Sequence, residues 1–600
     1  MNANKRDAIV ASFKQENIPT FAPGDPVFEL AVANPNLLYR FSRPGLVVQP
    51  ETILHVQYIV TQAKQQGIRI TIKNGGHSYA GFSSTDTGIL LDLANLLKTE
   101  QVKLDMKSKT VTLSGGARWG HAYRALLNDR LDGYVINGGR CPLVGVSGFT
   151  LGGGLGPFTR TFGMGIDSLK EVTMVTAAGE VVTVNDKDAP NSKKGQLFWA
   201  LRGGGGGNFG VVVKLKTSLQ QLNDTVVVSG RYNWFPASTK AMEDRMTTMK
   251  SFYSIDWPTD LTIDTSWVCD LEKKDSVFGI RYLIYHNGNK SDFDKVIDAC
   301  LDSDTDLELG KQLKKRSMQE KSTRFFHETL ISQWFEESAK SFPGRNTKYT
   351  IYTSFVFQNN RKKMAAIVSI IKEEMQAFRD RFSEENDVKG LLQVTFIHSG
   401  GKASQKQRSD TAFRWRDGDY HAYIMIEWED KWLEGEMRDF CRAFKKRLRE
   451  FSMSNTAAFI NFADRQMTRS TYVKAYYGNN SRKLQRIKQA WDPDNYFRFT
   501  QSIPLPDPST KKNKGVAFGA FSARSAVMTA SNSVPMTVGF GVDGTDSEEE
   551  GDGGLEGEGS EVDEANGVDA IATEQWESYI PPPARDALLL QPYLSSYLSF

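Results

Sequence analysis

Residues 138–156 read GGRCPLVGVSGFTLGGGLG and place Cys141 among glycines. A second glycine-rich stretch, KNGGHSYAGFSS at residues 73–84, places His77 directly after two glycines. Because glycine has no side chain, such segments let the backbone pass close to a flat or charged ligand. A thiol and an imidazole can each form a covalent bond to an activated ring system. Together the two stretches predict a domain built around a large planar ligand that is tethered at two points.

The sequence around the two loops alternates between apolar strands and helices. RITIK at residues 69–73 is typical of a strand, and it ends at the first loop. The N–H groups of residues 74–76 then form a nest of the kind that suits a pyrophosphate. PETILHVQYIVTQAKQQG at residues 50–67 is typical of a helix. This pattern predicts an α+β nucleotide-binding domain over residues 39–221, with residues 1–38 as an N-terminal leader packed on the core.

The remaining chain has a different texture. Over residues 222–455, strands such as YHAYIMIEW alternate with charged helical stretches such as RKKMAAIVSIIKEEMQAFRDRF, which predicts a substrate domain with an antiparallel sheet covered by helices. Residues 456–505 form a closing segment that returns to the first domain. Residues 506–600 hold 5 Lys/Arg and 16 Asp/Glu and little apolar surface, so we expect a disordered acidic tail there.

Composition excludes several classes of protein. With 40% apolar and 24% charged residues in 600, the chain can form two or more cores, and no apolar run is long enough to cross a membrane. The first residues lack the apolar core of a signal peptide. Four cysteines in no ligand spacing predict neither a disulfide framework nor a metal site. The basic residues are scattered and form no stripe, so we expect no binding to nucleic acid. Because neither a signal peptide nor a membrane span is seen, we expect a cytoplasmic protein that does not bind membranes, and we expect it to be a monomer.

Each loop also has a plain structural interpretation. A single histidine after a turn is often a buried structural residue, and an isolated cysteine is often a small apolar side chain. A third loop, RGGGGGNFGVVVKLK at residues 202–216, contains a GxGxxG match. A dinucleotide fingerprint needs a helix after the glycines. Here the strand-like VVVKL follows, so this match does not predict a Rossmann domain.

Five motifs together resemble the berberine bridge enzyme-like group of the vanillyl-alcohol oxidase superfamily, whose FAD domain is of the PCMH type. They are RPGLVVQPETILHVQYIV at 43–60, NGGHSYAG at 74–81, GGRCP at 138–142, RGGGGGNFG at 202–210 and YYGNNSRKLQRIKQAWDPDNYFRFTQSIP at 476–504. The resemblance runs from about residue 38 to residue 504. It implies an FAD-linked oxidoreductase with a PCMH-type flavin domain and a separate substrate domain.

The resemblance also implies residues that hold the cofactor. His77 would bind the C8 methyl group of FAD and Cys141 would bind C6, so that the flavin is attached covalently at two points. The other expected cofactor-binding residues lie in the same glycine loops and at the start of the strand after the third loop: Asn74, Gly75, Gly76, Ser78, Pro142, Val144, Gly145, Gly148, Gly152, Gly210 and Val211.

The implied reaction is an oxidation. A substrate carbon donates hydride to the flavin, a base removes a proton from the substrate, and O2 then reoxidises the flavin and gives H2O2. Three residues after the cysteine, the family has a side chain that controls access of oxygen to the flavin. The chain has Val144 there, the small residue that is typical of oxidases, and this side chain also has an ordinary packing role.

The chain departs from the family pattern at two positions. Phe149 stands where the family often has a histidine, and Phe462, in INFADR, stands where it commonly has a tyrosine base. Strand alternation places His421, Tyr423, Met425 and Glu427 on one face of YHAYIMIEW. Glu427 is therefore our first candidate for the base, if burial raises its pKa, and Tyr423 is the second. The alternative is a solvent-facing strand edge with ordinary charges.

The sequence favours an oxidase of a small aromatic, polyketide or alkaloid-like secondary metabolite. The partners would be this small molecule and O2. Two alternatives stay open. An oligosaccharide or alcohol oxidase would share the loops but would want the tyrosine that Phe462 replaces. A flavoprotein that catalyses a non-redox cyclisation would need no base at that position.

Overall fold

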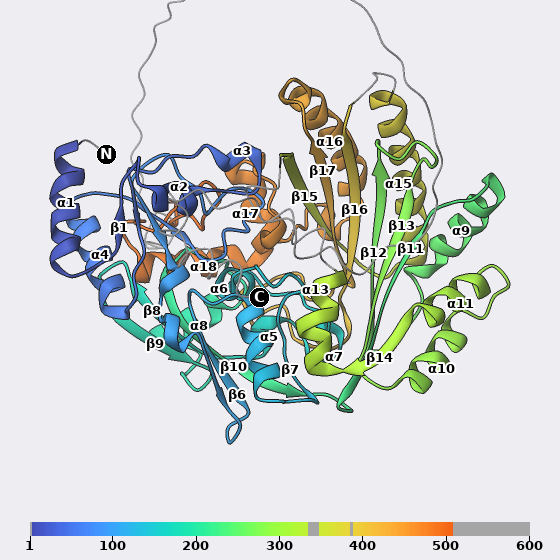
Figure 1. Ribbon diagram of the computed structural model, residues 1–600, viewed down its shortest axis with the longest axis horizontal. Helices are drawn as coiled ribbons and strands as arrows, with labels where there is room; N and C mark the ends of the chain where they lie inside the picture. Colours follow the sequence, from blue (N-terminus) through green and yellow to red (C-terminus); the bar gives the residue numbers. More distant parts are fainter. Residues whose placement is uncertain (1–2, 334–346, 384–387, 508–600) are drawn as a thin grey trace, which may run out of the picture. The chain divides into compact units, whose positions relative to one another are not determined.

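Three β-sheets organise the described part of the chain (Figure 1), which comprises residues 3–333, 347–383 and 388–507 of the computed structural model. All these residues fall within one compact unit, Met1–Thr510. The expected acidic tail at 506–600 lies outside the described residues except for its first two positions. Within this range the sheets contain four, six and seven strands, combined with helices, as expected for the α+β class.

The first sheet forms the base of the His77 loop. Its strands run in the order β1-β2-β4-β3, with β2, β4 and β3 parallel and β1 antiparallel at the edge. Helix α4 (Ile53–Gln65) connects β2 to β3. It begins where Thr52 Oγ1 accepts the N–H of His55 at 3.1 Å, and it is followed by Gly67 at a φ of +67°. The strands are β1 (Thr20–Phe21), β2 (Leu46–Val48), β3 (Ile70–Lys73) and β4 (Ile89–Asp92).

The second sheet is antiparallel and is organised around β10. This strand pairs with β6, β8 and β7. Strand β10 begins at Gly210, so a strand and not a helix follows the third glycine loop, as the sequence predicted. Strand β10 ends at Gln221. The other strands are β5 (Val102–Asp105), β6 (Thr110–Ser114), β7 (Tyr134–Ile136), β8 (Leu169–Thr176) and β9 (Val181–Asn185). The helices of this region are α5 (Trp119–Asn128), α6 (Val146–Leu151), α7 (Thr159–Phe162) and α8 (Lys193–Leu201).

The third sheet is antiparallel in the order β14-β11-β13-β12-β16-β17-β15. Its strands are β11 (Val226–Trp234), β12 (Leu261–Asp270), β13 (Gly279–His286), β14 (Ser317–Lys321), β15 (Tyr349–Phe357), β16 (Gly390–His398) and β17 (Tyr420–Trp428). Its helices include α9 (Thr239–Phe252), α10 (Lys290–Cys300), α11 (Leu307–Lys315), α15 (Arg361–Phe382) and α16 (Glu434–Arg449), drawn beside the sheet in Figure 1. No helix among the described residues is both long and apolar enough to cross a bilayer.

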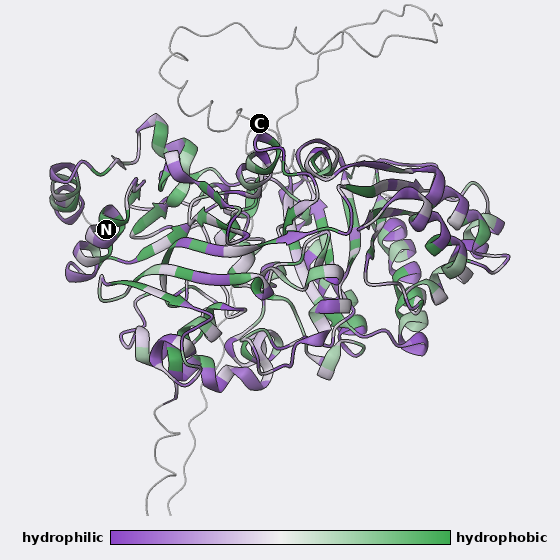
Figure 2. Cartoon of the chain, turned by 90° about the horizontal axis from the view of Figure 1, so that it is seen from below, coloured by the Kyte–Doolittle hydropathy of each residue, from purple (hydrophilic) through white to green (hydrophobic). Residues whose placement is uncertain are grey.

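The two faces of the third sheet have different partners. On β17, the residues Tyr420, Ala422, Ile424, Ile426 and Trp428 join the core formed with the helices. Tyr423 and Met425 alternate with them and pack with Ile397 and Phe459 in a separate cluster on the other face. Figure 2 shows hydrophobic and hydrophilic residues interspersed along the elements of the chain. The sheet is therefore buried on both sides, and its second face is available to form a site.

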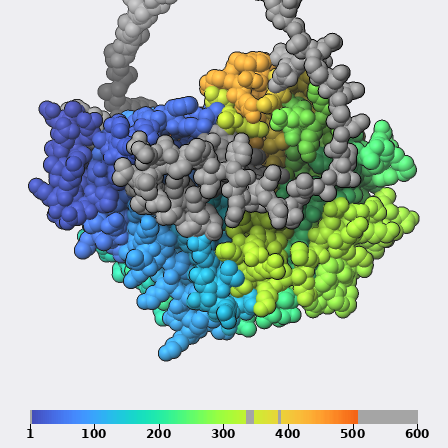
Figure 3. All heavy atoms as spheres, in the orientation of Figure 1, coloured from blue at the N-terminus to red at the C-terminus, as the bar shows by residue number. Residues whose placement is uncertain are grey.

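The N-terminal leader contacts both halves. Helix α1 (Ala3–Gln15), at the dark blue edge of Figure 3, buries Ile9 and Phe13 in the core of the first sheet. After α2 (Pro26–Val32), the Asn36 side chain donates to the Thr350 carbonyl at 2.8 Å and accepts the Thr350 N–H at 3.1 Å. Thr350 lies on β15, so this residue joins the leader to the third sheet.

Candidate active site

A cleft lies between the two glycine loops and the second face of the third sheet. Its empty volume, including its open mouth, is about 1750 Å³. Both loops line it, and so do Tyr423 on β17 and Ile397 on β16. The fold therefore brings His77 and Cys141 into the same cavity, although they lie 64 positions apart in the sequence.

Glycines make the loop side of the cleft possible. A Cβ atom on Gly145 would lie 1.7 Å from Asn74 Oδ1, and a Cβ on Gly75 would lie 2.5 Å from the Gly145 nitrogen. The two loops thus pack backbone against backbone, at distances that no side chain permits. Gly148 differs, because a Cβ there would meet no atom within 4 Å. It lines the cleft, so its missing side chain leaves room for a ligand.

His77 is a neutral imidazole at the wall of the cleft. Its Nδ1 lies 2.8 Å from the Gly75 carbonyl. Burial lowers the pKa of His77 to about 4, and the nearby charges of Arg118 and Lys73 act in the same direction, while the hydrogen bond to Gly75 opposes them. A neutral imidazole has a lone pair on one nitrogen, which is the form that can bond to an electrophilic carbon.

The Cys141 loop is supported from behind by α5. A Cβ on Gly138 would lie 2.4 Å from the Trp119 ring, and the Tyr123 hydroxyl donates to the Gly139 carbonyl at 2.5 Å. Burial raises the pKa of the Tyr123 hydroxyl well above its usual value, so it stays a donor. These contacts fix the backbone immediately before Cys141 and orient the residue at the cleft wall.

Aromatic rings line the opposite side of the cleft. Tyr79 stacks on Tyr352 of β15, with ring centroids 3.9 Å apart and planes 12° apart, and it lies 5.5 Å from the Phe462 ring. Phe462 is in turn 4.7 Å from Tyr423. Tyr79, Tyr423, Phe459 and Phe462 are all lining residues. This wall offers flat apolar surface and tyrosine hydroxyl groups to a substrate.

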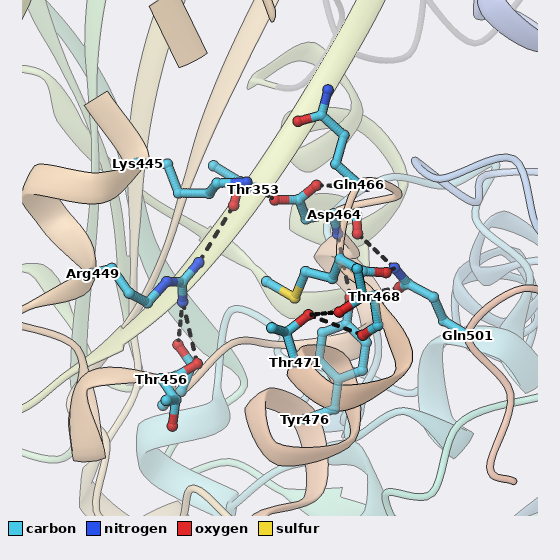
Figure 4. A network of polar contacts seen from close by, with 12 residues as sticks. Thr353, Lys445, Arg449, Thr456, Asp464, Gln466, Thr468, Thr471, Tyr476 and Gln501 are labelled. Carbon is cyan, nitrogen blue, oxygen red and sulfur yellow. Dashed lines mark hydrogen bonds and ion pairs between the residues drawn. The ribbon is translucent and has the colours of Figure 1, made fainter. Parts of the chain in front are cut away.

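A polar network holds the closing segment in place (Figure 4). Lys445 of α16 pairs with Asp464 at 2.8 Å, and the Asp464 carbonyl accepts from Gln501 at 2.7 Å. Gln501 Oε1 accepts the Tyr476 hydroxyl of α17 (Arg469–Tyr477) at 2.8 Å. Burial lowers the pKa of Arg449 to about 10, and its guanidinium donates to the Ala457 carbonyl at 2.8 Å.

The anchored segment delivers residues 459–462 to the cleft. The Asn461 side chain donates to the Phe149 carbonyl at 2.9 Å, which joins the closing segment to the Cys141 loop. Farther along, α18 (Ser481–Trp491) buries the Lys488–Asp492 pair at 2.7 Å. The Lys488 ammonium also donates to the Phe497 carbonyl at 2.6 Å, and Phe497 is a lining residue of the cleft.

Most residues expected at the site line this cleft. They are Asn74, Gly75, Gly76, His77, Ser78, Cys141, Val144, Gly145, Gly148, Gly210 and Tyr423. Four expected residues are not among the lining residues. The Pro142 carbonyl accepts the Gly120 N–H at 2.8 Å. Gly152 packs against the closing segment, since a Cβ there would lie 1.9 Å from Asn461 Oδ1. Val211 is buried in the core of the first sheet. Glu427 is buried on β17, opposite Thr350 of β15, four residues beyond Tyr423.

Sequence reasoning did not single out Tyr79, Tyr352 or Arg140 as site residues. Tyr79 lies two residues after His77, so its place in the loop was a usable signal. Arg140, a charged residue inside a glycine loop, was another. No local sequence signal marks Tyr352. It lies beside the cleft because β15 pairs with β17, and this pairing sets Tyr352 opposite Met425.

Known proteins share this architecture. An FAD-linked oxidoreductase named YgaK from Bacillus subtilis is 26% identical over 80% of this chain and 95% of its own length. A carbohydrate oxidase from Microdochium nivale is 26% identical over 83% of this chain and 95% of its own. A solved structure of the glucooligosaccharide oxidase from Acremonium strictum, described with a 6-S-cysteinyl, 8α-N1-histidyl FAD, has a TM-score of 0.66 at 20% identity. The match covers 83% of this chain and 99% of that protein's chain.

Two family models match the chain. The FAD binding domain matches residues 44–185, and the model described as berberine and berberine like matches residues 458–504. The chain therefore carries both domains of the berberine bridge enzyme-like, FAD-linked oxidoreductases. The resemblance found in the sequence motifs and the predicted PCMH-type fold are thereby confirmed.

Both matched segments of this berberine bridge enzyme-like oxidoreductase meet at the cleft. The FAD-binding segment contains His77 and Cys141, and the berberine-like segment contributes Phe459, Phe462 and Phe497. The glycine wall, the space at Gly148 and the neutral imidazole of His77 fit a large planar cofactor. The residues present therefore suit FAD in this cleft.

Proposed function

We propose that this oxidoreductase holds FAD covalently through His77 and Cys141 and oxidises a small aromatic, polyketide or alkaloid-like metabolite, with O2 as the acceptor and H2O2 as a product. The observation that carries the proposal is the position of both nucleophilic side chains on one glycine-lined cleft. The Acremonium strictum oxidase is described with a 6-S-cysteinyl, 8α-N1-histidyl FAD, a flavin with the same two kinds of attachment. Bound FAD would supply the electron-accepting chemistry.

The chain's own residues bind and orient the substrate. The ring of Tyr79, backed by its stacking on Tyr352, and the ring of Phe462 offer a surface on which an aromatic substrate can pack. Tyr423 is our proposed base, because its side chain lines the cleft. Glu427 is the second candidate, on the same strand face but outside the lining residues.

Attachment of the flavin is the first test. Wild-type protein should be yellow and should keep its flavin through acid precipitation and a denaturing gel. His77→Ala should leave flavin attached through Cys141, Cys141→Ala should leave it attached through His77, and the double variant should lose covalent flavin. Cys300→Ala, on α10 away from the cleft, is the matched control and should keep both attachments. Release of all flavin from wild-type protein by acid would contradict the proposal.

Removal of the base is the second test. In anaerobic stopped-flow measurements, Tyr423→Phe should slow flavin reduction by substrate about 10²–10⁴-fold, the usual effect of losing a positioned base. Reoxidation by O2 should be unchanged. Tyr420→Phe, on the opposite face of β17, is the control. If Tyr423→Phe keeps its rate and Glu427→Gln loses it, the base is Glu427. If neither variant slows reduction, the assignment of the base to this strand fails.

The oligosaccharide oxidase is the second candidate function. It is favoured by the names of the Microdochium nivale and Acremonium strictum proteins and by the aromatic wall, since sugars also stack on aromatic rings. Phe462 disfavours an oligosaccharide oxidase, because it has no hydroxyl group to act as the base. H2O2 release measured with matched panels of aromatic alcohols, alkaloids and oligosaccharides separates the two. Product formation without H2O2 or anaerobic flavin reduction would point to the non-redox cyclisation.

A further inference from the structure

Arg140, the residue before Cys141, forms a buried ion pair with Asp264 of the third sheet. Its Nε lies 2.5 Å from Asp264 Oδ2 on β12, and the two side chains are 5% and 3% exposed. Its Nη1 donates to the Leu155 carbonyl at 2.8 Å, and its guanidinium lies 5.5 Å from the centroid of the Tyr285 ring. The pair joins the Cys141 loop to the third sheet.

The pair is asymmetric with respect to the cleft. Arg140 and Leu155 are lining residues of the cleft and Asp264 is not, while the Arg140 guanidinium itself is buried at the cleft wall. Asp264 is held from its other side, since Oδ1 accepts the His398 N–H at 2.9 Å. Nη2 of Arg140 has no hydrogen-bond partner among the described residues.

A buried ion pair is an energetically unfavourable way to join the Cys141 loop to the third sheet. Desolvation of two charges costs several kcal/mol per ion, and apolar residues of similar volume often serve as well or better. Burial raises the pKa of Asp264, and the nearby Arg140 charge opposes this effect. A fixed cation at a ligand cleft, with a donor group left over, therefore calls for an explanation beyond packing.

We propose that Arg140, oriented by Asp264, stabilises the negative charge that the flavin acquires on reduction and so makes the bound flavin a stronger oxidant. The inference rests on the proposed binding of FAD in this cleft. When the oxidised flavin takes up two electrons and one proton, it becomes an anion with one negative charge. A cation held in a site of low dielectric stabilises that anion more than the neutral oxidised ring. No further reactant is required.

The test is the midpoint potential of the bound flavin, measured by equilibration with a reference dye in full-length flavinylated protein. Arg140→Met removes the cation and should shift the equilibrium toward oxidised flavin by about tenfold. For a two-electron couple this is about 30 mV toward negative potential. Asp264→Asn leaves the cation without its counter-charge and should shift the potential in the positive direction. Arg140→Lys should keep most of the wild-type value.

Arg416 and Asp167 provide the matched control. This second buried pair is bidentate, at 2.8 and 2.9 Å, and neither residue lines the cleft. Arg416→Met should lower the free energy of unfolding. It should leave the equilibrium constant for flavin reduction within about twofold of the wild-type value, so that the midpoint potential is nearly unchanged.

Opposite shifts in Arg140→Met and Asp264→Asn support the proposal, because a packing defect has no reason to change sign with the charge removed. Shifts in the same direction, no shift, or an equal shift in Arg416→Met would overturn it. If Arg140→Met does not accumulate as folded protein, Asp264→Asn decides, and an unchanged or more negative potential there rejects the inference. Wild-type protein without flavin would instead reject the proposed function.

Discussion

The two walls of the cleft are built by different means. The loop wall is made by backbone, with glycines 75 and 145 in contact at distances that exclude a Cβ atom. The opposite wall is made by side chains of the third sheet and the closing segment, above all the rings of Tyr423 and Phe462. The difference suggests a division of labour. A backbone wall has one shape and fits one cofactor, whereas a side-chain wall can change its substrate with few substitutions and little cost to the fold.

The largest effect on flavin binding and stability is expected where the two glycine loops pack against each other. Gly145→Ala would force a Cβ against Asn74 Oδ1 and to within 2.6 Å of the Gly75 nitrogen, so the loops must separate. We expect loss of nearly all bound flavin and overpacking that costs about 1–3 kcal/mol or more. Gly148→Ala is the matched variant, because its Cβ meets nothing within 4 Å in the protein.

For Gly148→Ala we expect an unchanged melting temperature of the flavin-free protein and a lower flavin content. Flavin content per chain comes from the absorbance spectrum, and stability comes from thermal unfolding. If Gly145→Ala retains full flavin, or if the two variants behave alike, the loop wall is not the close-packed surface described above.

Behind the side-chain wall, the buried His421 of β17 should make stability depend on acid pH. Its Nδ1 lies 2.7 Å from Ser399 Oγ, and burial lowers its pKa to about 3, with the charge of Arg416 acting in the same direction. The folded state thus keeps His421 neutral while the unfolded chain binds a proton below about pH 6.5. Its contribution to the free energy of unfolding is full above pH 6.5 and decreases as the pH falls toward 3, by up to about 1.4 kcal/mol per pH unit.

His421→Gln should therefore flatten the dependence of the melting temperature on pH between about 6.5 and 3, although the variant starts from a lower value at neutral pH. The comparison is made by thermal unfolding of wild-type and variant protein over this range. Parallel curves for the two proteins would show that His421 does not titrate in this way.

The smallest effect is expected at Val144, a loop-wall residue that lines the cleft with a side chain. Val144→Ile adds one methylene group and should slow reoxidation of the reduced flavin by O2 several-fold. Reduction by substrate should be unaffected, because the proposed base, Tyr423, and the Phe462 ring lie on the other wall. Stopped-flow measurement of the two half-reactions separates them. Equal rates of reoxidation in wild-type and variant protein would place the control of oxygen elsewhere.

Local signals sufficed for much of the fold. The helix expected from RKKMAAIVSIIKEEMQAFRDRF is α15 (Arg361–Phe382), and the strand expected from YHAYIMIEW is β17 (Tyr420–Trp428). Periodicity of apolar residues carries this information, because a helix and a strand each bury a regular subset of positions. The same alternation correctly placed Tyr423 and Met425 together on one face.

Local signals were weaker for the substrate side of the site. Glu427 and Tyr423 share a strand face, but only Tyr423 lines the cleft. Alternation assigns a face and not a distance along the strand, so it could not tell which of the two residues lies beside the loops. That choice depends on where the closing segment, held by Asp464 and Gln501, packs against the sheet.

The sequence by itself determined the cofactor side of this oxidoreductase. Glycines 75, 145 and 148, with His77 and Cys141, stand in short motifs, and these motifs predict a cofactor site without knowledge of what packs against them. That Gly75 and Gly145 meet was decided by the tertiary structure. Only the tertiary structure decided the rest. The stack of Tyr79 on Tyr352 and the pairing of Arg140 with Asp264 join residues that are far apart in the chain. Such contacts arise from the packing of one half against the other, and no local pattern of residues encodes which side chains meet there.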